Sequence, residues 1–314
     1  MPPDPDEIVE QRLRTEAERR KAPIEVVRYA VLRRGLDAAQ SDRQARAVAA
    51  DVVLVTATPT EHHELERAAK ELGFGLTAQP GRAGDYYRLG DVGTNRVVAM
   101  RVSIGAFSPD GAAARAARSI QARAETQATT IMLIGTAFGI DQARQNIGDV
   151  IVSESVFLYD DRRIVDADKE SARKYKVMYP STPSTARKVA SGTWHDRFRR
   201  LAEQYLQDGT AEKVDLGVIL SGGARIESAA YRDEVVASLP PMDQPVIGGE
   251  MEGMGAISAA LSTDPYDPGW VVVKGTSDFA DAPSRLKIKE TRAVAARASA
   301  MAVLRVLQLP PRNV

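Results

Sequence analysis

From residue 51 to the C-terminus, short runs of hydrophobic residues alternate with longer amphipathic stretches. The short runs are rich in β-branched residues and have few polar interruptions, which is typical of strands that are buried on both faces of a sheet. The pattern therefore predicts an α/β fold of three layers, in which helices cover both faces of a central mixed, largely parallel twisted sheet. The predicted strands are 51–56, 96–102, 130–135, 149–153, 216–221 and 271–275.

The stretches between these runs repeat their hydrophobic positions with the period of an α-helix. The predicted helices are 61–72, 110–124, 194–207, 229–238, 251–261 and 290–307. The stretch 160–191 is polar and contains Pro180 and Pro183, so it is predicted to be a long loop or insertion. Ligands of such sheets bind where the strands end. We therefore look for chemistry first in the segments after four of the strands, 56–61, 135–139, 221–225 and 274–278.

Residues 1–50 differ from the rest of the chain, because charged residues of both signs fall on most of their helical turns. Hydrophobic positions such as Ile8, Leu13 and Val27 follow a helical spacing that Pro23 interrupts, which predicts two short helices. We interpret residues 1–50 as a helical extension used for packing or dimerisation. The main domain is expected to span residues 51–314.

The composition removes several classes of protein. The 314 residues include 42 Lys and Arg against 42 Asp and Glu, so no overall positive charge attracts nucleic acid or an acidic membrane surface. Cysteine is absent, which excludes disulfide scaffolds, Cys-ligated zinc, iron–sulfur clusters and a Cys nucleophile. No apolar signal segment opens the chain, and no stretch is long and apolar enough to cross a membrane. We expect a cytoplasmic protein that binds neither nucleic acid nor membrane.

The sequence also offers no motif for a cofactor. The first predicted strand is not followed by GxGxxG or by a P-loop, so a dinucleotide or P-loop phosphate site has no support. His62 and His63 are adjacent and would point about 100° apart on a helix, which does not place both on one metal ion. His195 stands alone beside Trp194, where a structural role is expected. We expect no metal ion and no organic cofactor.

Two acidic segments are the most informative part of the sequence. Residues 248–253 read GGEMEG at the predicted start of a helix, and residues 274–281 read KGTSDFAD after the last predicted strand. On a helix, Glu250 and Glu252 would point about 200° apart, so only one of them is expected to face a ligand. Both segments follow strands, which places them at the edge of the sheet where ligands bind.

These motifs resemble those of the nucleoside phosphorylase/nucleosidase superfamily, whose purine-handling members carry Glu-Met-Glu on a helix and Ser-Asp just after the next strand. The resemblance extends to VTATPTE at 55–61, to GTAFGIDQARQNIGDVIV at 135–152 and to LSGGARI at 220–226. It covers about residues 51–307. The motifs occur in the family's order along the chain, and the resemblance implies that residues 51–314 are a nucleoside phosphorylase-like catalytic domain.

The chemistry of N-glycosidic cleavage gives these residues their expected roles. The bond breaks through an oxocarbenium-like sugar, so the site needs a carboxylate for the ribose hydroxyls, an acid for the leaving base, and a nucleophile. The resemblance implies that Glu252 accepts hydrogen bonds from the ribose 2′ and 3′ hydroxyls and that Met251 packs under the sugar. It also implies that Asp278, oriented by Ser277, protonates the purine at N7. Burial and a nearby carboxylate favour the protonated form of such an acid.

Glu61 decides between the two reactions of the family. The larger phosphorylases grip phosphate with a Gly and an Arg after the first strand, whereas the hydrolases carry an acid there that activates water. This chain has Thr-Pro-Thr-Glu at 58–61 and no Arg before Arg67. We therefore predict an N-ribosyl hydrolase that releases the free base of a purine nucleoside or nucleotide. A phosphate-dependent purine nucleoside phosphorylase and a non-catalytic nucleotide-binding sensor of a signalling or defence system remain alternatives, as does a Glu61 that only complements the helix dipole.

The remaining candidates would surround the base. They are Glu250, Ala137, Phe138, Gly139, Arg225 and Ile226. Arg225 stands where the family usually has an aromatic residue, and its guanidinium group can either stack on a base or bind a phosphate. Phe138 is then the candidate for the missing aromatic ring. The family commonly completes each pocket with a residue from a neighbouring subunit, so the resemblance also implies a homo-oligomer, a dimer or higher.

Overall fold

The computed structural model describes residues 49–81, 85–102, 125–159, 162–163, 174–175, 178–180, 194–253, 269–281 and 285–310, together with residues 11, 14, 15, 18 and 19. The chain divides into two compact units, 1–47 and 48–314. The five residues described in the first unit are helical. The helix predicted at 110–124, and residues 254–261 of the one predicted at 251–261, lie outside the described residues.

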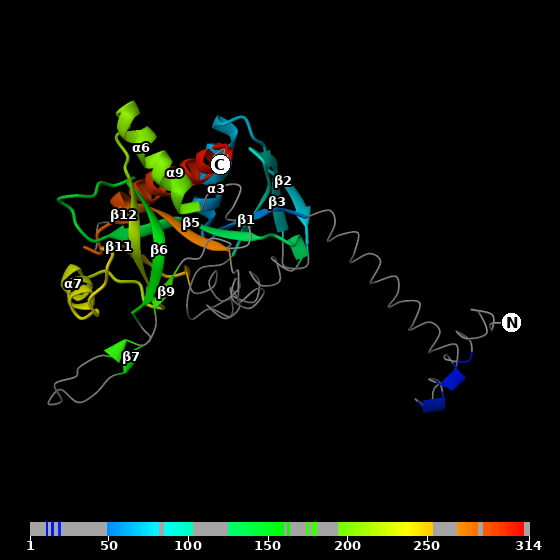
Figure 1. Ribbon diagram of the computed structural model, residues 1–314, viewed down its shortest axis with the longest axis horizontal. Helices are drawn as coiled ribbons and strands as arrows, with labels where there is room; N and C mark the ends of the chain where they lie inside the picture. The colour runs from blue at the N-terminus through cyan, green and yellow to red at the C-terminus, as the bar shows by residue number, and fades with distance from the viewer. Residues whose placement is uncertain are drawn as a thin grey trace. The chain divides into compact units, whose positions relative to one another are not determined.

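Ten strands of the second unit form one mixed sheet (Figure 1). Its strands are β1 (Val52–Thr56), β2 (Thr77–Pro80), β3 (Asp85–Val92), β4 (Asn95–Arg101), β5 (Thr130–Gly139), β6 (Val150–Leu158), β9 (Met178–Pro180), β10 (Val214–Ser221), β11 (Val246–Glu250) and β12 (Trp270–Asp278). Their order is β11-β10-β6-β12-β5-β1-β4-β3-β2, and β9 pairs with β6. Two further strands, β7 (Arg162–Arg163) and β8 (Lys174–Tyr175), pair with each other.

The sheet contains both parallel and antiparallel pairs of strands, and two of its long buried strands, β6 and β12, pair antiparallel. β1 pairs in parallel with β4 and β5, and β12 pairs in parallel with β5. β11 pairs in parallel with β10 and antiparallel with β5, which closes the path β5-β12-β6-β10-β11 into a barrel-like ring. The C-terminal ends of β5, β11 and β12 therefore meet at one place, through the antiparallel pairing of Gly248 with Gly139 and the pairing of Asp278 with Phe138.

The described helices of this unit are α3 (Pro59–Glu71), α6 (Trp194–Asp208), α7 (Ala229–Ala237) and α9 (Arg285–Gln308). α9 packs on β12 and β5 and also contacts α3 and α6, and Figure 1 shows these three helices on the same side of the sheet. The mixed α/β fold predicted from the sequence is confirmed. The cover of the opposite face stays a prediction, because the helix expected at 110–124 lies outside the described residues.

The strand predictions ended some strands too early and missed others. β5, β6 and β12 continue past the predicted ends into polar residues that turn out to be buried, such as Ser155 and Thr276. β2, β3 and β11 were missed, because they are partly exposed or contain charged residues and glycine. The predicted loop 160–191 was also wrong in part, since β7, β8 and β9 lie within it.

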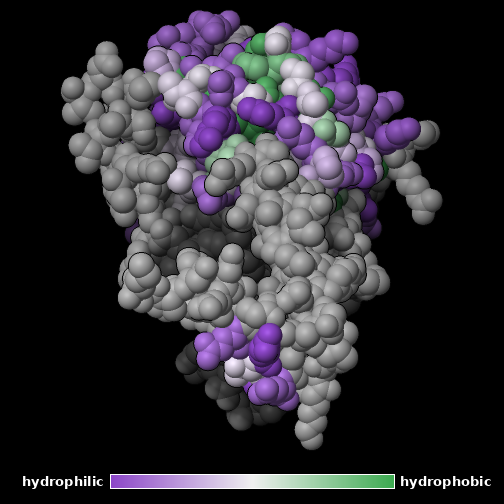
Figure 2. Space-filling model, turned by 90° about the vertical axis from the view of Figure 1, so that its right-hand side faces the viewer, coloured by the Kyte–Doolittle hydropathy of each residue, from purple (hydrophilic) through white to green (hydrophobic). Residues whose placement is uncertain are grey.

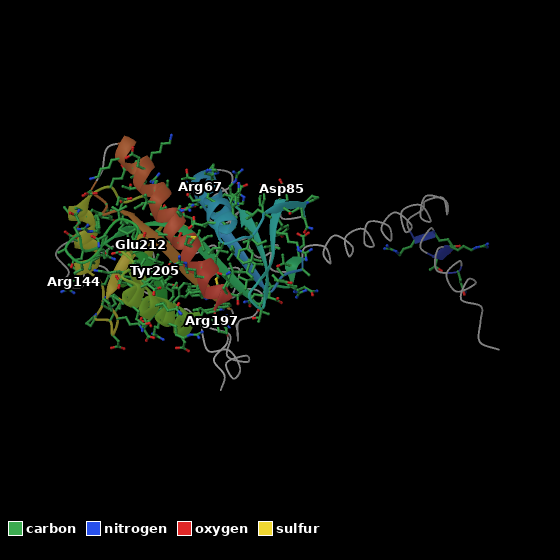
Figure 3. All side chains as sticks on the ribbon, turned by 90° about the horizontal axis from the view of Figure 1, so that it is seen from above. Arg67, Asp85, Arg144, Arg197, Tyr205 and Glu212 are labelled. Atoms are coloured by element: carbon green, nitrogen blue, oxygen red, sulfur yellow. The ribbon has the colours of Figure 1, made fainter. Side chains whose placement is uncertain are left out.

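The described surface is mostly polar. On the face shown in Figure 2, hydrophilic residues make up most of the described surface and hydrophobic ones form only small areas. Leu206 and Val294 are the large hydrophobic side chains that are exposed among the described residues. In Figure 3, Tyr205 and Glu212 lie beside α9, where they line a cavity of about 270 Å³. None of the described helices is both long enough and apolar enough to span a membrane.

Candidate active site

A cavity of about 440 Å³ opens where β5, β11 and β12 end beside the first turn of α3. Every predicted site residue except Gly139 lines it, namely Glu61, Ala137, Phe138, Arg225, Ile226, Glu250, Met251, Glu252, Ser277 and Asp278. Thr58, Pro59, Thr60, Thr136, Gly249 and Arg292 complete the wall. A cavity of this size is in the range of small-molecule sites. The fold therefore brings together segments that are far apart in the sequence.

Glu61 is fixed at the start of α3 by a capping box. Thr58 accepts a hydrogen bond from the Glu61 backbone N–H at 3.0 Å, and the Glu61 carboxylate accepts from the Thr58 backbone N–H at 2.9 Å. The same carboxylate accepts from the backbone N–H groups of Ala57 and Thr136, each at 2.9 Å. The side chain is buried, with 4% of its surface exposed. Glu61 thus serves the helix dipole and also faces the cavity, so the two roles considered for it are compatible.

Gly135 makes this position of Glu61 possible. Its φ angle is +149°, and a Cβ atom built there would lie 2.1 Å from Glu61 Oε1. Any other residue would push the carboxylate out of its place. Gly249 plays a similar part on the other wall, because its Cβ would lie 2.2 Å from the ring of Phe138. The glycines therefore let two walls of the cavity approach closely.

The Glu-Met-Glu motif is not on a helix, which corrects the prediction. Glu250 ends strand β11, and Met251 and Glu252 lie in the bend that follows it. Residues two positions apart in an extended chain point to the same side, so both acids line the cavity. The expectation that only one of them faces a ligand stays a prediction, although the helical geometry from which it was argued was wrong.

The two acids nevertheless differ in exposure and in hydrogen bonding. Glu250 has no exposed side-chain surface, and its carboxylate accepts from the backbone N–H groups of Glu252 at 2.7 Å and Gly253 at 2.8 Å. Glu252 keeps 11% of its side-chain surface exposed. Glu250 therefore fastens the bend, and Glu252 is the acid that a ligand in the cavity can reach.

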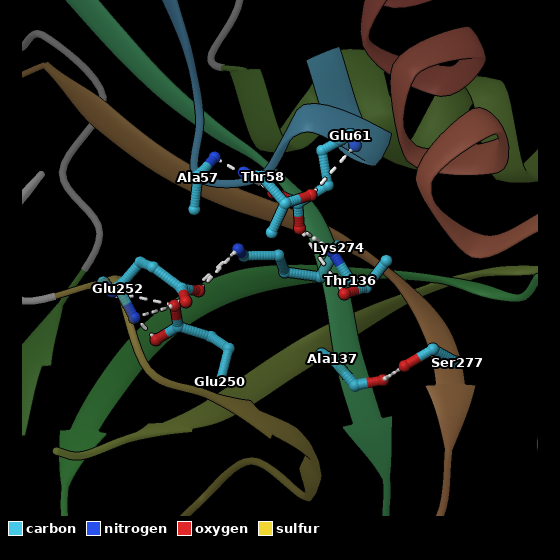
Figure 4. Close-up of polar contacts among 10 residues, drawn as sticks. Ala57, Thr58, Glu61, Thr136, Ala137, Glu250, Glu252, Lys274 and Ser277 are labelled. Carbon is cyan, nitrogen blue, oxygen red and sulfur yellow. Dashed lines mark hydrogen bonds and ion pairs between the residues drawn. The ribbon is translucent and has the colours of Figure 1, made fainter. Parts of the chain in front are cut away.

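Lys274 is the counter-charge of this acidic group, and the sequence motifs gave it no role. It lies in β12 with no exposed side-chain surface, and its Nζ is 3.1 Å from Glu252 Oε2 and 3.9 Å from Glu250 Oε2 (Figure 4). Burial lowers the pKa of Lys274, but the charges of Glu252, Glu61 and Glu250 raise it by more than burial lowers it. The pKa of Lys274 therefore lies above the usual value. A lysine at the end of the apolar run WVVV was the signal that could have identified it, since a buried lysine needs an acidic partner.

Burial shifts the pKa of the neighbouring acid, Glu250, in the opposite direction. It raises the pKa of Glu250 above its usual value, and Lys274 offsets only part of this shift. Lys274 therefore remains a cation, and its closer contact is with Glu252. The Glu252 carboxylate therefore lies beside a buried positive charge.

Ser277 and Asp278 stand apart from this lysine, at the end of β12. Ser277 Oγ lies 2.9 Å from Asp278 Oδ2. It also lies 3.1 Å from the carbonyl oxygen of Ala137 (Figure 4). The other carboxylate oxygen of Asp278 accepts from the Ala280 backbone N–H at 3.0 Å. Within the described part of the chain, Asp278 makes no ion pair. The hydroxyl and the backbone therefore orient the acid without a positive charge.

Most of the residues expected around the base do line the cavity, but Gly139 only lets the strands pack. Phe138 and Ile226 are buried and line the cavity, while Arg225 is exposed and pairs with Glu227 at 2.7 Å. Gly139 does not line the cavity. It pairs with Gly248 in the sheet, and a Cβ there would meet Phe279 at 2.8 Å, so its role is to let the strands pack.

Arg292 of α9 is a second cavity residue that the sequence reasoning missed. Its Nε atom is buried and has no hydrogen-bond partner among the described residues. No signal in the sequence singles it out, because it lies in a helix with several other arginines. His195, by contrast, has the structural place expected for it, with Nε2 2.9 Å from the carbonyl oxygen of Ser153. The described residues contain no cluster of His, Asp and Glu that could hold a metal ion.

The site can now be compared with known proteins. A sequence profile of the phosphorylase superfamily matches residues 51–308. The chain belongs to this superfamily. The family predicted from the acidic motifs and the Gly-rich turn is therefore confirmed.

Solved structures with the same fold include nucleosidases of low sequence identity. A 5′-methylthioadenosine/S-adenosylhomocysteine nucleosidase from Colwellia psychrerythraea, in complex with adenine, has a TM-score of 0.61 at 20% identity over 83% of this chain and 96% of that chain. The enzyme of that name from S. pneumoniae, with the transition-state inhibitor MT-ImmA, has a TM-score of 0.60 at 18% identity over 82% and 98% of the two chains.

A similar curated protein is a death domain-containing ATP nucleosidase from Amphimedon queenslandica. It is 28% identical over 184 residues, which is 55% of this chain and 32% of that protein. The match thus spans about a third of the length of this relative.

Proposed function

We propose that this protein hydrolyses the N-glycosidic bond of a purine nucleoside or nucleotide and releases the free base. The observation that carries the proposal is the placement of three acids, Glu61, Glu252 and Asp278, on different walls of one cavity. A carboxylate for the ribose, an acid for the leaving base and a base for water are the groups that this reaction needs. The similarity to nucleosidases supports the proposal.

Glu252 binds the ribose in this proposal. Lys274 holds it as an anion, so it accepts hydrogen bonds from the 2′ and 3′ hydroxyls. The negative charge also stabilises the positive charge that develops on the sugar ring as the bond breaks. Met251 contributes an apolar surface under the sugar. Lys274 is a positioning residue, because it acts through Glu252.

Asp278 supplies the proton to the base. Ser277 has one hydroxyl proton but two oxygen atoms within hydrogen-bond distance, Ala137 O and Asp278 Oδ2. In the reaction, Ser277 donates to Asp278 Oδ2 and so orients the carboxyl group toward the base. The proton that Asp278 brings to the reaction moves to purine N7 as the C1′–N9 bond breaks, and the bonding electrons leave with the base.

Glu61 completes the hydrolysis. It takes a proton from a water molecule, and the oxygen of that water bonds to C1′ of the sugar. The net reaction consumes one water and yields free base and free sugar. A phosphorylase would need donors for phosphate at this position, but the backbone N–H groups of Ala57, Thr58 and Thr136 already bind the Glu61 carboxylate. This arrangement favours water over phosphate as the nucleophile.

The proposal is tested by chromatographic detection of free base after incubation with adenosine, inosine, guanosine and their nucleotides in phosphate-free buffer. We expect release of base and free sugar at a rate that added phosphate does not increase. Strict dependence on phosphate, with a sugar 1-phosphate as product, would show a phosphorylase. Tight binding of a nucleotide without release of base from any substrate would favour the sensor function.

Glu61→Gln provides the matched variant for this assay, because it keeps the size and one acceptor oxygen while removing the base. We expect at least a 100-fold loss of base release, in line with the usual contribution of a general base. Glu66→Gln is the control, since Glu66 is an exposed residue of the same helix that does not line the cavity. Equal activity of Glu61→Gln and Glu66→Gln would remove Glu61 from the reaction.

Three further features belong to the proposal. Residues 1–50 form a helical extension, residues 51–314 form the catalytic domain, and the protein is a cytoplasmic homo-oligomer. The test compares the full chain with a chain that begins at residue 49. Light scattering measures assembly, and thermal melting and base release test the division into an extension and a catalytic domain. We expect the shorter chain to melt cooperatively and to retain base release per subunit, with any change confined to assembly.

A further inference from the structure

The positive charges around the cavity are not equivalent. Lys274 is engaged by Glu252 and Glu250, and Arg225 pairs with Glu227. Arg292 also lines the cavity, but no ion pair engages it within the described part of the chain. Arg292 is therefore the cation of the cavity whose charge the described residues leave without an acidic partner.

The helix that carries this arginine, α9, packs on α3. Arg297, on the same helix, lies 3.8 Å from Glu64 of α3 and also pairs with Glu71. Arg292 lines the same cavity as the first turn of α3, which includes Thr60.

The other walls already have tasks in the proposed reaction. Ser277 and Asp278 face the base, and Glu252 faces the 2′ and 3′ hydroxyls. The substituent of the sugar that remains without a wall is the one at C5′. Arg292 and Thr60 are lining residues that have no task yet, and they offer a guanidinium group and a hydroxyl rather than an apolar surface.

We infer that the substrate carries a phosphate at C5′ and that Arg292 binds it, an inference that rests on the proposed function. Burial of the Arg292 Nε atom without a partner costs free energy. A charge-assisted, often bidentate contact with phosphate oxygens offsets that cost. An apolar 5′ substituent would leave that nitrogen without a partner and seal it from water. Arg292 is thus a specificity-determining residue that selects nucleotides over nucleosides.

The test compares kcat/KM for AMP and adenosine in the full-length protein and in three variants of α9. Arg292→Leu removes the charge, and Arg292→Lys keeps the charge but lacks the planar fork of donors. Lys289→Leu is the control, because Lys289 is an exposed residue of α9 that does not line the cavity. Thermal melting of each variant checks that it folds.

We expect the unchanged protein to prefer AMP by at least about 10-fold. Arg292→Leu should lower kcat/KM for AMP by about 10- to 100-fold and change that for adenosine by no more than about 2-fold, because a charge-assisted contact is lost only for the phosphate. For AMP, kcat/KM of Arg292→Lys should lie between the values of the unchanged protein and Arg292→Leu. Lys289→Leu should match the unchanged protein. A preference for adenosine, or an equal loss for both substrates in Arg292→Leu, would overturn the inference.

A binding measurement separates this inference from the proposed function. Calorimetric titration of AMP and adenosine into Asp278→Asn, with and without Arg292→Leu, needs no turnover. Tighter binding of AMP that Arg292→Leu abolishes would support the inference even if no substrate released its base, which would reject only the proposed function. Equal affinity for AMP and adenosine in Asp278→Asn would reject the inference and leave the proposed function standing. If Arg292→Leu fails to melt cooperatively, Arg292→Lys and the AMP-to-adenosine ratio of the unchanged protein decide in the same way.

Discussion

The two acidic regions of the cavity are held by different means. At the end of β11, Glu250 and Glu252 lie beside the buried Nζ of Lys274. At the end of β12, Asp278 has a serine hydroxyl and a backbone N–H as partners and, among the described residues, no cation. The regions are adjacent in space, because β12 carries both Lys274 and Asp278.

This difference matches the chemistry expected of each region. A fixed cation favours the ionised form of a carboxylate, whereas a hydroxyl partner accepts or donates with either form. In the proposed reaction, Glu252 accepts from the ribose hydroxyls and faces a developing positive charge, and Asp278 gives a proton to the leaving base. The strand β12 carries both Lys274, the cation beside the first acid, and the second acid itself.

Loss of Lys274 should have the largest effect. Lys274→Met leaves Glu250 and Glu252 buried without a counter-charge, and breaking a buried pair in this way typically costs about 3–5 kcal/mol. We expect a drop of that size in the free energy of unfolding, measured in urea, together with loss of base release. Lys213→Met is the control, since Lys213 is exposed, and it should change stability by less than about 0.5 kcal/mol. A stable, active Lys274→Met protein would show that Glu250 and Glu252 do not need Lys274 as a counter-charge.

Asp278→Asn should separate activity from stability. The substitution keeps the shape of the side chain but removes the proton donor, which typically contributes about 10²- to 10⁴-fold in rate. We expect base release to fall by that factor and the free energy of unfolding to change by about 1 kcal/mol or less. Near-normal base release would show that the proton comes from another group.

The pH dependence of stability should come from the Lys274 region. Burial, together with the charge of Glu252, raises the pKa of Glu250 to about 7 from a usual value of 4.5, although Lys274 and the Glu252 backbone N–H act in the opposite direction. Between these values the folded chain holds a proton that the unfolded chain releases, so the contribution is complete below the unfolded pKa and is lost as pH rises through the folded pKa. We expect Glu250→Gln to flatten the fall in unfolding free energy from about pH 5 to about pH 8. An unchanged slope would show that Glu250 is ionised throughout.

Ser277→Ala should give the smallest effect. It removes one hydrogen bond to Asp278 and leaves the acid itself in place, and such a bond is typically worth about 0.5–1.5 kcal/mol. We expect base release to fall by about 2- to 12-fold, as measured by kcat/KM, which is less than the loss in Asp278→Asn. A loss as large as that of Asp278→Asn would make Ser277 part of the proton transfer rather than a positioning residue.

The sequence predicted the main elements of the fold where hydrophobic patterns were strong. The buried runs of β1, β5 and β12 and the amphipathic α3 were found, with errors mainly at their ends. β3 and β11 were missed because local composition does not reveal a strand whose stability comes from its neighbours. β11 contains two glycines that are needed for close approach to Phe138 and Ile151, and glycine argues against a strand when only the sequence is considered.

The candidate site was predictable in its parts and not in its electrostatics. Motifs located Glu61, Glu252 and Asp278, and the fold brings these residues to one cavity. The role of Lys274 depends on its burial and its distances to two acids, which no pattern along the chain contains. Arg292 could not be identified for the same reason, because its place at the cavity depends on how α9 packs on α3 and β12.

A leaving-group comparison tests the assignment of the two regions most directly. Adenosine needs a proton on its base to leave, whereas the 4-nitrophenolate of 4-nitrophenyl β-riboside leaves without one. We measure kcat/KM for both substrates in Asp278→Asn and Glu252→Gln. The account predicts that Asp278→Asn loses about 10²- to 10⁴-fold on adenosine and less than about 10-fold on the nitrophenyl riboside, while Glu252→Gln loses activity on both. An equal loss on both substrates in Asp278→Asn would contradict the account, because Asp278 would then not be the donor to the base.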